Sequence, residues 1–211
     1  MQRASKSHWL IPPLVALGLL IGLDAEAAPP PDSGGLDGGG YIQLAPGVVG
    51  IGLGQNDFRD DFRLGWSWGV GAGWMFSGGP FKIAIGGAFE HHALIFDQYR
   101  RSAVRGNGLN FLGEMRLGAG SRRVWGYGLI GLGPSLTLLD WNDSLYTGNQ
   151  AFSGLDFEFG GGVQGMITRR FFLGGEIDFD NGFYFDAEER LDDYDFSYHM
   201  MTLKFMLGWY F

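Results

Sequence analysis

One residue pair in this 211-residue chain has the types and spacing of a nucleophile and its base. Ser197 and His199 lie two residues apart, so on an extended strand they would share one face. A hydroxyl beside an imidazole can act in an esterase, but the imidazole needs an acid to orient it, and none is evident on that face. Two polar residues at the outer end of a strand are the simpler interpretation. We therefore predict no catalytic residues and no enzyme activity.

The other chemical signals do not indicate a metal, a nucleotide or a nucleic acid. The chain has no Cys, and the adjacent His91 and His92 would point to opposite faces of a strand, so they cannot bind one metal ion without a bulge. Residues 126–131 match G-x-G-x-x-G, but they follow a turn and do not open a helix on which a phosphate could rest. A net charge of −8 argues against a phosphate backbone as partner. We expect no metal site and no cofactor.

The first 40 residues differ in composition from the rest. Arg3 and Lys6 give a basic start, residues 9–23 form an apolar run with two prolines, and Ala25 and Ala27 stand at the spacing of a cleavage site. We predict a secretory signal peptide over residues 1–27. Residues 28–40 are rich in Pro and Gly and predict a periplasmic leader, and residues 41–211 form one domain.

From residue 41 onward, large apolar side chains recur at every second position, which is the period of a β-strand. In residues 64–76 the face opposite the aromatic residues contains only Gly, Ser and Met. Such alternation occurs eight times and predicts eight strands. Their apolar faces are Val49, Ile51, Leu53; Leu64, Trp66, Trp68, Val70, Ala72, Trp74, Phe76; Phe81, Ile83, Ile85, Phe89; Leu109, Phe111, Met115, Leu117; Trp125, Tyr127, Leu129; Leu155, Phe157, Phe159, Val163; Phe171, Leu173, Ile177, Phe179; and Met201, Leu203, Phe205, Leu207, Trp209, Phe211.

The connections between these strands alternate in length. Residues 77–80, 120–123 and 167–170 are tight turns, and the long connections are residues 55–63, 93–107, 140–153 and 180–195. A face of Gly, Ser and Met solubilises a sheet poorly but fits the narrow interior of a closed sheet whose aromatic face meets lipid. We predict an all-β fold, an eight-stranded antiparallel up-and-down transmembrane β-barrel.

The inward face carries the charges. With the apolar faces outward, the positions that point into the lumen are Lys82, Glu90, Asn110, Glu114, Arg116, Asp156, Glu158, Gln164, Glu176, Asp178 and Lys204. Buried ions must pair, so we predict a lumenal polar network centred on Arg116 and Lys204, with Glu114, Glu158 and Glu176 as partners. Asp178, Lys82 and Glu90 could instead lie at solvated rims. A packed interior implies a plug of side chains and no wide channel.

Residues 125–133, with a Gly at every second or third position, and the ending Phe-Met-Leu-Gly-Trp-Tyr-Phe at 205–211 resemble small outer-membrane β-barrel proteins of Gram-negative bacteria, the opacity-porin-like and OmpX/OmpW-type group. The resemblance implies location in the outer membrane, with short turns in the periplasm and long loops outside. It also implies that Leu207, Trp209 and Phe211 are the signal read by the barrel-assembly machinery. Outer-membrane lipid and lipopolysaccharide would be the other partners. Deacylases of lipid A in this group use a His-x-Ser pair, whereas this chain has Ser-x-His.

The long connections are where a barrel of this kind would meet its surroundings. Residues 180–195 hold seven acidic residues against Arg190, and residues 93–107 hold three Arg against Asp97. A hydrated crown that attracts the divalent ions of lipopolysaccharide accounts for both; a docking surface for an extracellular ligand or weak Ca²⁺ binding are the alternatives. We predict a structural or surface-interaction role through four extracellular loops. The open alternatives are a narrow pore or lateral route for small hydrophobic molecules, and a lipid A-modifying hydrolase.

Overall fold

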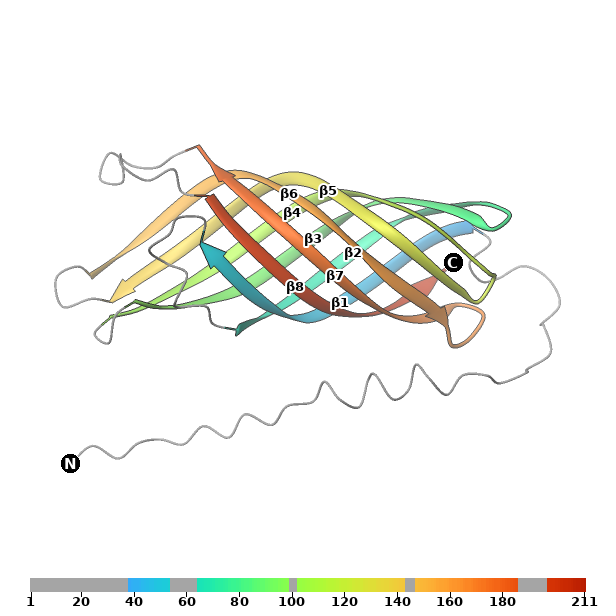
Figure 1. Cartoon of the computed structure of the whole chain (residues 1–211), viewed down its shortest axis with the longest axis horizontal. Helices are drawn as coiled ribbons and strands as arrows, with labels where there is room; N and C mark the ends of the chain where they lie inside the picture. Colours follow the sequence, from blue (N-terminus) through green and yellow to red (C-terminus); the bar gives the residue numbers. More distant parts are fainter. Residues whose placement is uncertain (1–37, 54–63, 99–101, 143–146, 186–196) are drawn as a thin grey trace, which may run out of the picture. The chain divides into compact units, whose positions relative to one another are not determined.

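The computed structural model describes residues 38–53, 64–98, 102–142, 147–185 and 197–211, which form a closed barrel of eight antiparallel strands (Figure 1). The predicted fold class is confirmed. The strands are β1 (Gly38–Leu53), β2 (Leu64–Gly78), β3 (Phe81–Gln98), β4 (Ser102–Gly120), β5 (Val124–Asn142), β6 (Thr147–Met166), β7 (Phe171–Tyr184) and β8 (Ser197–Tyr210). Each strand pairs with its neighbours in sequence, and β8 pairs with β1 to close the barrel. In the part of the chain that the structure describes, no helix has the length and apolarity to cross a membrane.

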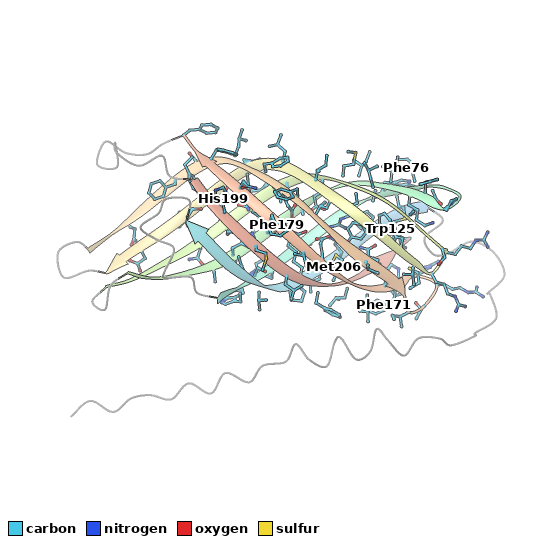
Figure 2. The ribbon with its side chains drawn as sticks, in the orientation of Figure 1. Phe76, Trp125, Phe171, Phe179, His199 and Met206 are labelled. Atoms are coloured by element: carbon cyan, nitrogen blue, oxygen red, sulfur yellow. The ribbon has the colours of Figure 1, made fainter. Side chains whose placement is uncertain are left out.

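The alternating pattern places its two faces as predicted on most strands. Trp66, Ile85 and Phe205 are exposed on the outside, whereas Thr202 and Lys204 are buried inside. Figure 2 shows Phe76 and Phe179 on the outside of the ribbon and Met206 within it. Large apolar side chains therefore cover the outer surface, and the polar residues fill the interior.

The prediction for β5 is wrong: Trp125, Tyr127 and Leu129 face the lumen, and Ile130 faces outward. The two rings carry polar groups that find partners inside. Trp125 Nε1 donates to Gln164 Oε1 at 2.9 Å and the Tyr127 hydroxyl donates to Glu176 Oε2 at 2.7 Å. At these two positions the lumen offers hydrogen-bond partners to the N–H and O–H groups, which hydrocarbon would not.

The prediction is also wrong at Val49, which is fully buried inside the barrel, while Val48 is exposed. β1 contains Pro46, which has no N–H to donate. The pairing of β1 with β8 passes from Leu44↔Leu207 to Gly47↔Lys204 without the two pairs between them. Gly47 and Val49 both point inward beyond this gap, so the inner face of β1 carries a small and a large apolar residue. In β1, residue size therefore does not indicate the face as it does in β8.

The strands are longer than the sequence predicts, and the long connections are shorter. β3 ends at Gln98 and β4 begins at Ser102. β5 ends at Asn142, β6 begins at Thr147, and β7 ends at Tyr184. The predicted connections 93–107, 140–153 and 180–195 are therefore partly strand. In these segments apolar and polar residues no longer alternate strictly, and residues 93–96 for example are all apolar, but the ladder of backbone hydrogen bonds continues through them. β1 begins at Gly38, so the last three residues of the predicted leader are strand; residues 1–37 and 54–63 lie outside the described residues.

Candidate functional site

Two of the buried cations in the lumen, Arg116 and Lys204, each lie among several carboxylates. The first is Arg116 on β4, which is buried. Its Nη2 lies 3.0 Å from Glu114 Oε2 and 3.4 Å from Glu176 Oε2. Its Nη1 donates to Gln43 Oε1 at 2.7 Å, and the guanidinium lies 5.4 Å from the centroid of the Tyr127 ring. This guanidinium therefore joins β1, β4, β5 and β7 across the barrel axis.

The second cation is Lys204 on β8. Its Nζ lies 2.9 Å from Glu158 Oε1 on β6 and 2.9 Å from Asp178 Oδ2 on β7, and it also donates to Glu90 on β3. Glu176 lies between the two cations, since its Oε1 is 3.9 Å from Lys204 Nζ while its Oε2 contacts Arg116. The two groups thus form one connected network.

The structure brings the five residues of the predicted network together in the lumen: Glu114, Arg116, Glu158, Glu176 and Lys204. It also buries Lys82, Glu90 and Asp178, for which solvated rims had been the alternative. Asp180 belongs with them, although the sequence pattern assigns it to a long connection. Asp178 and Asp180 stand at alternating inward positions of β7, which is the signal that would have identified Asp180.

A third polar group lies on the loop side of Lys204. Asn110 donates to Asp156 and accepts a hydrogen bond from Ser135 at 2.8 Å. Thr202 donates to Asp180 Oδ2 at 3.4 Å. These hydrogen bonds link β4 to β5 and β6, and β8 to β7, so polar side chains lie across the lumen at this level.

Apolar and aromatic side chains pack together in the lumen at the end near the short turns. Tyr210 packs against Tyr41 and Phe172 with ring centroids 5.9 and 5.0 Å apart, and Trp125 packs against Tyr127 at 4.6 Å. The sequence pattern did not predict this cluster, because it assigned Trp125 and Tyr127 to the outer face. Both rings pack within this cluster, and their polar groups find partners in the lumen.

The histidines take separate positions. His199 is exposed, and its Nδ1 lies 2.5 Å from Asn181 Oδ1, which is an amide and not a carboxylate. The side chain of its predicted partner, Ser197, lies outside the described residues. His91 packs between Trp66 and Trp68 on the outer face, and His92 is fully buried in the lumen.

The residues of the predicted assembly signal share the outer face of β8. Trp209 and Phe211 are exposed and Leu207 is half-buried. The Phe211 N–H donates to the carbonyl oxygen of Gly40 at 2.9 Å, so the last residue is held against β1. Residues 126–131 of the glycine motif lie inside β5, where no helix begins.

A closed eight-stranded antiparallel barrel with apolar residues outside and ion pairs inside defines the class as a small β-barrel of the outer-membrane type. Neisserial surface protein A is 11% identical, with a TM-score of 0.57 over 82% of this chain and 97% of that protein. The attachment invasion locus protein Ail of Yersinia pestis (13% identity, TM-score 0.47, 81% and 99% coverage) and OprG of Pseudomonas aeruginosa (14%, 0.42, 85% and 99%) also match. No protein-family model and no curated sequence matches the chain. The predicted resemblance is therefore confirmed at the level of the fold.

Proposed function

We propose that this protein is an outer-membrane β-barrel with a side-chain-filled lumen and a structural or surface-interaction role through its four extracellular loops. The observation that carries the proposal is the combination of an apolar outside with a closed, ion-paired inside. Monomeric soluble proteins expose apolar patches of at most several hundred Å². Here exposed apolar side chains occur on all eight strands, for example Trp74 on β2 and Leu203 on β8.

The filled lumen favours this role over that of a pore. The network around Arg116 and Lys204 joins strands on opposite sides of the barrel, and the aromatic cluster around Tyr210 closes the end near the short turns. Planar-bilayer recording of the refolded protein tests this point. We expect no stepwise conductance; reproducible channel openings would favour the alternative of a narrow pore.

Trypsin digestion of intact cells tests the location and the orientation. Arg59, Arg63 and Arg190 belong to the long connections, whereas Arg122 and Arg170 belong to the short turns. We expect trypsin to cut at the long connections in intact cells and at the short turns only after the outer membrane is permeabilised. Cleavage at the short turns in intact cells would overturn the orientation, and recovery of the protein in the soluble fraction would overturn the membrane location.

A lipid A-modifying hydrolase finds little support, because Asn181 and not an acid lies against His199. Replacing Ser197 with Ala and measuring lipid A acylation by mass spectrometry tests it. We expect no change in acylation.

A further inference from the structure

The buried charges in the lumen do not balance. The described interior holds seven carboxylates against the cationic side chains of Lys82, Arg116 and Lys204, and each of these ten residues is at most 5% exposed. The carboxylates are Glu90, Glu114, Asp156, Glu158, Glu176, Asp178 and Asp180. An ionised carboxylate removed from water is very unfavourable unless a positive charge compensates it. The interior therefore needs further cations or protons to neutralise the carboxylates that the side chains of Lys and Arg do not compensate.

The excess of carboxylates over cations is greatest beside Lys204. One carboxylate oxygen from each of Glu90, Glu158 and Asp180 lies within 4.8 Å of the other two, although these residues come from β3, β6 and β7. One oxygen of each is bonded: Lys204 binds Glu90 Oε1 and Glu158 Oε1, and Thr202 binds Asp180 Oδ2. Their other oxygens, Glu90 Oε2, Glu158 Oε2 and Asp180 Oδ1, have no hydrogen-bond partner among the described residues. Lys204 also contacts Asp178, so its single positive charge is shared among three carboxylates, Glu90, Glu158 and Asp178.

A buried imidazole lies against Glu90, one member of this group. His92 is fully buried, and neither of its ring nitrogens has a hydrogen-bond partner within the described part of the chain. Its Nε2 lies 3.4 Å from Glu90 Oε2, one of the three oxygens without a partner. Buried polar groups in folded proteins are almost always bonded, so this ring is an observation independent of the acidic residues. An imidazole nitrogen is among the commonest metal ligands in proteins.

We propose that Glu90, Glu158, Asp180 and His92 bind a divalent metal ion of the first transition row, such as Zn²⁺ or Mn²⁺, inside the barrel. Carboxylate oxygens suit Mn²⁺ and an imidazole suits Zn²⁺, and both ions accept the mixed set. The ion supplies two of the four missing positive charges and links three strands. The prediction from the sequence that no metal is bound rested on the absence of Cys and on His91 and His92 pointing to opposite faces. Closure of the barrel brings Glu158 of β6 and Asp180 of β7 to Glu90, which in turn contacts His92. The second carboxylate group, Glu158, Glu176 and Asp178, already surrounds the Lys204 ammonium.

Metal retention by the refolded protein tests the site. Because the ligands are buried, the chain is unfolded with a chelator, refolded in detergent micelles with Zn²⁺ or Mn²⁺, and freed of loosely bound metal by gel filtration. We expect about one ion per chain and a higher melting temperature than after refolding with the chelator alone. Asp180→Asn and His92→Gln should each lower the affinity by about tenfold or more.

Glu114→Gln is the matched control, because it also replaces a lumenal carboxylate with an amide but lies beside Arg116 and outside the site. It should retain the ion, and circular dichroism of each variant shows whether the barrel has formed. The ligand set is overturned if Asp180→Asn folds and binds the ion as tightly as the unaltered protein, or if Glu114→Gln loses it equally. Retention of Ca²⁺ but of neither Zn²⁺ nor Mn²⁺ would overturn the role of His92. If the folded protein retains no ion and Asp180→Asn alone raises the melting temperature, a proton and not a metal neutralises the group.

Discussion

Replacing Lys204 with Met tests whether the ion network stabilises the barrel. The Lys204 ammonium lies 2.9 Å from Glu158 Oε1 and 2.9 Å from Asp178 Oδ2 and also binds Glu90. Removing one partner of a buried ion pair costs about 3–5 kcal/mol, because the remaining charge loses its compensation. Since Lys204 contacts several carboxylates directly, we expect Lys204→Met to lower the free energy of unfolding by the upper end of that range, about 5 kcal/mol.

The measurement is urea unfolding of the refolded protein in detergent micelles, followed by tryptophan fluorescence. Met206→Leu is the control, because Met206 lies on the same lumenal face of β8, is fully buried and changes little in volume; it should cost less than about 1.5 kcal/mol. The double variant Lys204→Met, Glu158→Gln removes one of the uncompensated charges and should recover part of the loss. Equal stability of Lys204→Met and Met206→Leu would refute the reasoning.

Three further predictions concern the outer face, the close packing and the end of the chain. Ile130 and Val124 are exposed on the outer face of β5 to similar extents, 46% and 50%, but Val124 adjoins the short turn. In lipid vesicles, Ile130→Arg should lower the free energy of unfolding by about 2–4 kcal/mol and Val124→Arg by about 0–1 kcal/mol; equal costs would contradict a lipid-facing surface. A Cβ at Gly133 would overlap the carbonyl oxygen of Phe111, whereas at Gly128 the nearest backbone atom is 3.9 Å away. Gly133→Ala should therefore lower the free energy of urea unfolding by about 1–3 kcal/mol, and Gly128→Ala by much less. Equal effects of the two variants would mean that the strands at Gly133 can move apart to accept the methyl group. Deleting Phe211 should slow insertion into vesicles that contain the barrel-assembly machinery more than insertion into plain lipid; equal slowing would argue against a recognition signal.

The strand order and the inward charges could be predicted because both follow from a period of two. On β8, Lys204 and Thr202 alternate with Leu203 and Phe205, and a charge cannot face lipid without a large cost. The same reasoning placed Arg116 and Glu114 on the inner face of β4. Where one face is charged and the other apolar, the sequence defines the orientation of the strand.

The pattern misled where size and polarity point in different directions. Trp125 and Tyr127 are large and mostly apolar, which favours the outer face, but each has a polar group that Gln164 and Glu176 satisfy inside. The sequence pattern assigns Asp180 to a connection because Asn181 interrupts the apolar positions after Phe179, although Phe183 continues them on the outer face. Both errors arise from reading hydrophobicity alone, when hydrogen bonding across the lumen contributes energies of similar size.

The pairing of charges across the lumen depends on the stagger between strands, which no single strand encodes. A slip of two residues between neighbouring strands leaves every side chain on the same face but moves it along the barrel by two positions. The pair Glu176↔Lys204 is set by the register of β7 and β8, whereas the contact of Lys204 with Glu90 spans the barrel and depends on the accumulated registers of β1, β2 and β3. Because Lys204, Glu90 and Glu158 lie on three strands that are not neighbours, their meeting requires closure of the barrel with one particular stagger. The lumenal network therefore specifies the register as well as depending on it, since a slipped barrel would bury the same ions without their partners.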